Sequence, residues 1–219
     1  MRIDSHHFFS ERYPLAHLES ILKRNRFEGG ILVGTECWPD EDFVKGVVVC
    51  GDRFPPSQLD AYQEHPKFRG VCCAVRAGEL PDFLVELERR AIPLDLTGGL
   101  AAASEIARRF PGLRIAIDHL GAPFEVDWAG MLEEAATYPN VFCKLSGLAR
   151  MGPSVRSQVR HAMALFGQER LMFGSDWPNS LPEHSWKENL AAFTQAIGAQ
   201  PLDIREELLG GTAARFYSL

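Results

Sequence analysis

The 219-residue sequence lacks the features that mark several classes of protein. No apolar run approaches the roughly 20 residues that a transmembrane helix needs, so no membrane contact is expected. The net charge of −6 argues against nucleic acid as a partner, because nucleic-acid binders present basic faces. The first residues also lack the apolar segment of a signal peptide, and we therefore expect a cytoplasmic protein.

Cysteine is scarce, and its spacing is not that of a disulfide framework or a zinc site. The five cysteines form no C-x-x-C motif and are odd in number: Cys37, Cys50, Cys72, Cys73 and Cys143. Most of them lie in apolar runs, where a thiol behaves as a small hydrophobic side chain. We expect reduced, buried thiols.

The sequence contains a regular alternation of short apolar runs and amphipathic segments. No repeat or long linker divides it, so residues 1–219 are expected to form a single domain. The predicted strands are residues 1–6, 30–34, 46–50, 70–75, 93–96, 114–119, 141–144 and 170–174. The predicted helices are residues 55–65, 81–91, 100–110, 153–166 and 185–197.

This alternation predicts an α/β fold with a parallel sheet. A doubly wound sheet would give the same pattern, but eight strands favour a (β/α)8 TIM barrel. Only about eleven residues join the second strand to the third, which is close to the minimum for a crossover helix. We therefore predict a small or distorted barrel in which the helix after strand 2 is reduced or missing.

The most informative segment ends the eighth predicted strand. Its apolar residues lead through Gly174 to the carboxylate of Asp176, and Pro178 then stops strand pairing. A buried carboxylate is costly unless it binds, titrates or accepts hydrogen bonds. In a barrel of this type, catalytic side chains lie at the carboxyl ends of the strands. Asp176 is therefore a candidate catalytic residue, although a capping role for this carboxylate is the alternative.

Two histidines occupy corresponding positions on other strands. Strict alternation places Asp4, His6 and Phe8 on one face of the first strand. In the sixth strand it points His119 inward after Ile117 and Asp118 outward. Strands one and eight are neighbours in a closed barrel, so we expect His6, His119 and Asp176 to converge.

Two imidazoles and a carboxylate suit one divalent metal, with zinc as the best candidate and His7 as a further possible ligand. The same groups suit metal-free hydrolysis, in which Asp176 deprotonates water and the histidines polarise a carbonyl. Lys144, at the end of the seventh strand, could hold an anionic substrate, and Trp177 is the second candidate substrate-binding residue. Glu36, Arg76 and Asp95 also lie near strand ends and are weaker candidates.

Six stretches, in this order along the chain, resemble the amidohydrolase-related family of the amidohydrolase superfamily, in particular its sugar-lactonase and dicarboxylate-lactonase branch. They are residues 2–6, 65–70, 114–123, 140–147, 170–178 and 210–217. The resemblance implies hydrolysis of a lactone or a related small carbonyl ester at the carboxyl ends of the barrel strands. It also implies that Asp176 is the base, and that some relatives work without metal whereas others bind one or two ions.

The chain departs from the family pattern at two places. Phe8 stands where the family has its second strand-one histidine, and Cys72 and Cys73 end the fourth strand where an arginine or histidine is usual. No strand-four lysine is present to bridge two metals, so a binuclear site is not expected.

Three functional hypotheses follow. The first is a lactone hydrolase for a small, anionic substrate. The second is a metal-dependent decarboxylase of an unsaturated or aromatic acid. The third is a catalytically impaired barrel that serves as a binding or assembly module, with a homodimer formed through Trp38 and residues 37–43.

Overall fold

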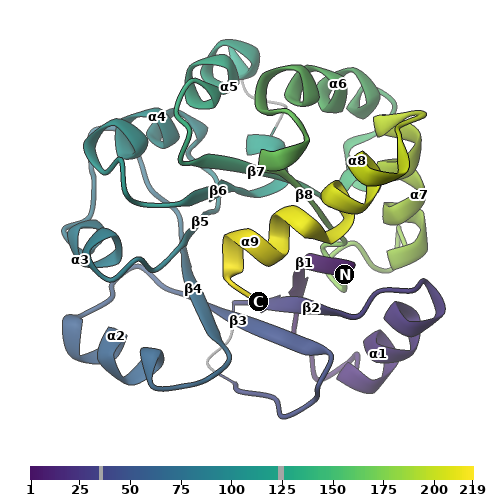
Figure 1. Cartoon of the computed structure of the whole chain (residues 1–219), viewed down its shortest axis with the longest axis horizontal. Helices are drawn as coiled ribbons and strands as arrows, with labels where there is room; N and C mark the ends of the chain where they lie inside the picture. Colours follow the sequence, from purple (N-terminus) through teal and green to yellow (C-terminus); the bar gives the residue numbers. More distant parts are fainter. Residues whose placement is uncertain (35–36, 123–125) are drawn as a thin grey trace.

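The computed structural model describes residues 1–34, 37–122 and 126–219. Eight parallel strands form one sheet in the order β1 to β8 (Figure 1). The strands are β1 (Ile3–Phe8), β2 (Gly29–Val33), β3 (Val44–Cys50), β4 (Phe68–Cys73), β5 (Leu94–Leu96), β6 (Ile115–Ile117), β7 (Val141–Ser146) and β8 (Leu171–Gly174).

Helices surround the sheet and confirm the predicted α/β barrel (Figure 1). They are α1 (Leu15–Arg24), α2 (Pro56–Gln63), α3 (Phe83–Arg89), α4 (Leu100–Arg109), α5 (Trp128–Ala136), α6 (Val155–Phe166), α7 (Trp186–Ile197), α8 (Leu202–Glu206) and α9 (Thr212–Tyr217). Helices α1, α5, α8 and α9 were not predicted, although Leu15, Leu18 and Leu22 recur at helical spacing on α1. None of the described helices is long and apolar enough to cross a bilayer.

The connection from β2 to β3 contains no helix in its described part, residues 37–43, as predicted. Other side chains cover this part of the barrel instead. The Trp38 ring stacks on the ring of His65 with their centroids 4.2 Å apart, and Lys67 donates hydrogen bonds to the carbonyl oxygens of Pro39 and Glu41. These contacts tie the link to the segment between α2 and β4.

The barrel closes where β8 meets β1. The backbone N–H of Asp176 donates to the carbonyl oxygen of His6 at 2.9 Å, and that of Phe8 donates to the carbonyl oxygen of Trp177 at 2.7 Å. The closing hydrogen bonds therefore include both Asp176 and His6. The convergence of these two residues is a direct consequence of barrel closure.

The apolar core has two layers. The larger cluster lies between the strands and the helices and includes Leu94, Ile117 and Phe173. A smaller cluster fills the barrel interior and includes Ile3 and Met172, together with Phe216 and Tyr217 from α9. In Figure 1 α9 crosses the middle of the barrel, so the C-terminal helix plugs the barrel end.

The structure corrects two expectations about strand faces. Asp118 points inward and Ile117 outward, because β6 ends at Ile117 with Ala116, not Ile117, on the interior face. In β1 the register shifts between Asp4 and His7. The carboxylate of Asp4 consequently accepts a hydrogen bond from the indole of Trp186 on α7, at 2.7 Å, and does not share the face of His6.

The cysteine expectation is also wrong in part. Cys73 and Cys143 are buried thiols, as expected, but Cys50 and Cys72 form a disulfide. The two residues face each other across β3 and β4, with their Cα atoms 4.3 Å apart. The strand register that places them opposite each other is not visible from cysteine spacing.

Phe173 offers a direct test of the outer core layer. Its side chain is buried against the rings of Phe27, Trp186 and Phe193. We expect Phe173→Ala to lower the free energy of unfolding by about 3–5 kcal/mol, measured by urea denaturation, because it leaves a cavity. The matched control is Phe9→Ala at a position that is 42% exposed, which should change stability far less. Equal losses in the two variants would contradict this packing.

Candidate functional site

The predicted triad lies together at the carboxyl ends of β1, β6 and β8. One donor atom each from His6, His119 and Asp176 lies within 4.8 Å of the others. The rings of His6 and His119 meet edge to face with their centroids 4.7 Å apart. The structure therefore brings together the three side chains that the sequence singled out, although their roles stay predictions.

Local backbone geometry explains how His119 reaches this place. The chain leaves β6 after Ile117, and both His119 and Leu120 adopt positive φ angles, of 51° and 55°. This left-handed turn is sterically unfavourable for residues other than glycine. It lets Asp118 and His119, which are adjacent in sequence, both reach the interior. Asp176 also has a positive φ of 58°, directly after β8.

Asp176 is almost fully buried but has polar partners. Arg150 donates to its Oδ2 at 3.3 Å, and Asn179 donates to its Oδ1 at 3.4 Å. Burial raises the pKa of Asp176 above its ordinary value, against the lowering effect of His119 and Arg150. This carboxylate is therefore a stronger base than an exposed aspartate.

His119 is held by Ser146 at the end of β7. The hydroxyl of Ser146 lies 2.8 Å from Nδ1 of His119, and it also accepts a hydrogen bond from the backbone N–H of His119 at 3.2 Å. These two contacts fix both the ring and the turn that carries it. His119 is thus a preorganised side chain rather than a mobile surface residue.

Two cavities adjoin this cluster, and His119 lines both of them. One has a volume of about 290 Å³ and is lined by Asp176, Arg150, Asn179, Met151, Gly147 and Ala122 in addition to His119. The second, of about 390 Å³, is lined by His6, Phe8, Val33, the Cys50–Cys72 disulfide, Thr97 and their neighbours. A small organic molecule can therefore reach His6, His119 and Asp176 from the barrel mouth.

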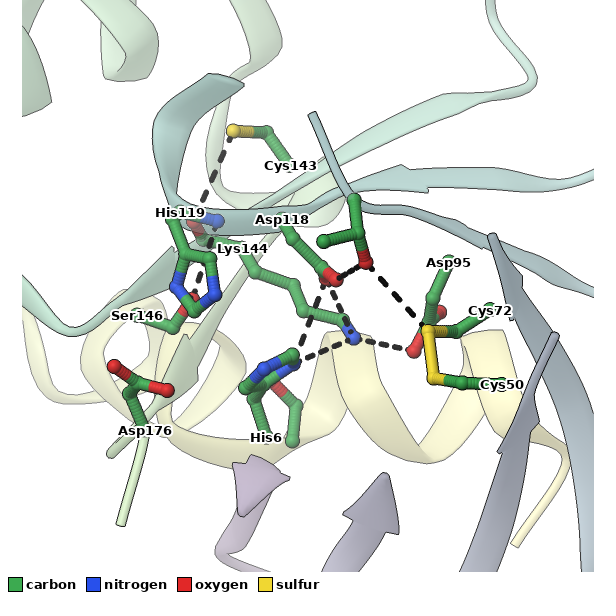
Figure 2. Close-up of polar contacts among 12 residues, drawn as sticks. His6, Cys50, Cys72, Asp95, Asp118, His119, Cys143, Lys144, Ser146 and Asp176 are labelled. Carbon is green, nitrogen blue, oxygen red and sulfur yellow. Dashed lines mark hydrogen bonds and ion pairs between the residues drawn. A yellow bond between two sulfur atoms is a disulfide. The ribbon is translucent and has the colours of Figure 1, made fainter. Parts of the chain in front are cut away.

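Beneath the mouth lies a buried ionic cluster that the sequence did not predict as a unit. The ammonium group of Lys144 is 2.5 Å from Oδ2 of Asp95, 2.9 Å from Oδ1 of Asp118 and 3.2 Å from Nδ1 of His6 (Figure 2). Tyr217 of the α9 plug donates to Asp95 at 2.9 Å. The cluster therefore connects the plugged end of the barrel to His6.

The two carboxyl groups in this cluster differ in pKa. Burial alone would raise the pKa of Asp118, but Lys144, His6 and His119 together outweigh burial and lower that pKa to about 2. Burial raises the pKa of Asp95 to about 6, although Lys144 opposes this rise. Lys144 contacts both carboxylates and lies nearer to Asp95, and its completely buried ammonium lies below the cavity rather than in it.

The remaining predicted residues lie elsewhere. Trp177 is buried against the rings of Tyr13 and His17 and does not line either cavity. His7 is buried on the opposite side of β1, beside Gly30, and burial lowers its pKa to about 3. Arg76 is exposed, and Glu36 falls outside the described residues. Phe8, in place of the family's second histidine, contacts the His6 ring edge to face.

A metal site can be tested against these residues. The donor types and spacing of His6, His119 and Asp176 fit one zinc ion with an open position. The hydrogen bonding of His6 does not fit, because its Nδ1 contacts the Lys144 ammonium, whereas a histidine that ligates through Nε2 normally donates from Nδ1 to an acceptor. As hydrogen-bonded here, His6 therefore does not fit as a metal ligand.

Comparison with known proteins agrees with the fold and identifies the family. A family model described as amidohydrolase matches residues 33–219. The L-fucono-1,5-lactonase of Burkholderia ambifaria is 32% identical over 196 residues, which cover 75% of this chain and 66% of that protein. The corresponding enzyme of Burkholderia multivorans is 38% identical over 128 residues, which cover 48% of this chain and 43% of that protein. The chain thus spans two thirds or less of the length of these relatives.

Solved structures resemble the chain over nearly its whole length. A crystal structure of an amidohydrolase from Burkholderia multivorans with bound zinc has a TM-score of 0.82 and 26% identity, and the match covers 100% of this chain and 99% of that one. A putative 2-pyrone-4,6-dicarboxylic acid hydrolase from Pseudomonas putida has a TM-score of 0.74 and 25% identity, with 99% and 97% covered. Because the family model matches most of the sequence, the chain belongs to the amidohydrolase family.

Proposed function

We propose that the chain hydrolyses a lactone, or a related small carbonyl ester, with Asp176 as the general base. The observation that carries this proposal is the convergence of His6, His119 and Asp176 beside two cavities at the barrel mouth. The similarity to L-fucono-1,5-lactonases and to a putative 2-pyrone-4,6-dicarboxylic acid hydrolase supports a lactone as substrate.

The chemistry follows from a carboxylate that lies beside two imidazole rings. Asp176 takes a proton from water as the water oxygen attacks the lactone carbonyl carbon. Donors on the histidine rings stabilise the negative charge that develops on the carbonyl oxygen. The ring C–O bond then breaks, and the proton on Asp176 passes to the departing oxygen. The product is a hydroxy acid, and Asp176 is again ionised.

Arg150 makes the cavity suitable for a polar or anionic substrate. It is half exposed at the cavity wall and donates to Asp176, so its guanidinium can also contact a substrate carboxylate or hydroxyl. In this proposal Lys144 does not touch the substrate. It contacts His6 from below the cavity. The second cavity, with Phe8, Val33 and the disulfide in its wall, provides an apolar surface for the substrate ring.

Asp176→Asn tests the base. The amide cannot accept the proton from water, so kcat should fall by about 10²–10⁴-fold. Turnover can be followed by the acid released from L-fucono-1,5-lactone, other sugar lactones and 2-pyrone-4,6-dicarboxylate. Asp203→Asn, which changes an exposed carboxylate on α8, should keep the activity of the unmodified protein. Undiminished turnover by a folded Asp176→Asn protein would reject the assigned role.

The pH profile tests the electrostatics of the same carboxylate. Hydrolysis requires ionised Asp176, so kcat/KM should rise with pH through a pKa above the ordinary aspartate value. Arg150 lowers this pKa, and Arg150→Met should therefore move the acid limb to higher pH. The exposed control Arg156→Met should leave the limb in place. A shift of the limb to lower pH in Arg150→Met would contradict the proposed base.

A further inference from the structure

The ammonium group of Lys144 has a complete set of partners only under one arrangement of protons. An ammonium carries three N–H donors and no acceptor. Three groups lie around Nζ: Asp95 Oδ2, Asp118 Oδ1 and His6 Nδ1, at 2.5, 2.9 and 3.2 Å (Figure 2). Lys144 is completely buried, so water cannot replace a missing acceptor. Each of the three groups must therefore accept a hydrogen bond.

This requirement determines the state of the His6 ring. Nδ1 can accept from Lys144 only through its lone pair, so it carries no proton. A proton on Nδ1 would face the ammonium N–H and leave one donor of a buried charge unsatisfied. The alternative partner for an Nδ1 proton, Asp118 Oδ1, lies farther away, at 3.5 Å, and is itself ion-paired with the Lys144 ammonium at 2.9 Å. Burial lowers the pKa of His6 well below its ordinary value, which keeps the ring neutral.

We infer that Lys144 is a positioning residue that holds His6 as its Nε2–H tautomer, so that His6 meets a ligand as a hydrogen-bond donor and not as a metal ligand. Nε2 is buried and has no hydrogen-bond partner in the described part of the chain. This ring nitrogen is the one left for a molecule in the adjoining cavity. The identity of its acceptor rests on the proposed function: Nε2–H donates to the carbonyl oxygen of a lactone or ester.

The Lys144 ammonium also occupies a second group of side chains that has the spacing of a metal site. His6, Asp95 and Asp118 form a buried group whose ligand atoms lie within 4.8 Å of one another, a spacing suited to a metal ion. The Lys144 ammonium contacts all three and supplies the positive charge there from the protein itself. A zinc ion at this position would need the lone pair on Nδ1 of His6, which already accepts from Lys144.

The test is the proton position on His6 in the unmodified protein. Long-range 1H–15N NMR distinguishes protonated from unprotonated ring nitrogens, and the His6 signals are assigned by their loss in His6→Gln. We expect a protonated Nε2 and an unprotonated Nδ1. One equivalent of zinc chloride should leave the Nε2 signal unchanged. The reverse tautomer, or a shift of Nε2 to a metal-bound value with zinc, would overturn the inference.

Variants test whether Lys144 causes this state. In Lys144→Met the His6 ring can donate from Nδ1 to Asp118, so the tautomer should switch to Nδ1–H. Lys187→Met, at an exposed lysine on α7, should keep the Nε2–H form. An unchanged tautomer in a folded Lys144→Met protein would refute the causal role. If that variant does not fold, the spectrum of the unmodified protein decides. None of these spectra depends on turnover, so a protein with the expected tautomer but no lactonase activity would refute only the proposed function.

Discussion

The buried ammonium of Lys144 is the interaction on which the site depends. Transferring a charge from water into a protein interior costs several kcal/mol unless it is paired and fully hydrogen-bonded. Four elements supply what it needs: Asp95 from β5, Asp118 after β6, His6 from β1 and, through Asp95, Tyr217 from α9. The hydrogen bonds and ion pairs of the Lys144 ammonium therefore hold together strands from both halves of the barrel. They also link these strands to α9, the helix that plugs the barrel.

Barrel closure places the proposed catalytic side chains above this buried cluster. The hydrogen bonds between β8 and β1 bring Asp176 next to His6, and the left-handed turn after β6 brings His119 over the same point. The Asp176 carboxylate and the rings of His6 and His119 thus line the cavities, while the ionic cluster lies below them. His119 and Asp176, the proposed catalytic residues, both have an unfavourable positive φ, and such backbone strain is common at functional sites.

Sequence reasoning succeeded where a pattern has one physical meaning. The alternation of strands and helices, the lack of a helix over residues 37–43 of the link before β3, and the meeting of His6, His119 and Asp176 were predictable. The last follows because strand ends in a barrel share one face. It failed where geometry departs from regular alternation. Both faces of β6 are apolar, so the direction of Asp118 was assigned wrongly, and the register shift in β1 moved Asp4. The disulfide and the partners of Lys144 depend on contacts between strands, which spacing along one strand does not reveal.

The most direct test of this account is a crystal structure of the chain with a phosphonate that mimics the tetrahedral intermediate of lactone hydrolysis. The account predicts one anionic oxygen within hydrogen-bond distance of Nε2 of His6 and of the His119 ring, and a second oxygen against Asp176. A phosphonate bound away from these three side chains, or one that reaches Asp176 without touching His6, would contradict it.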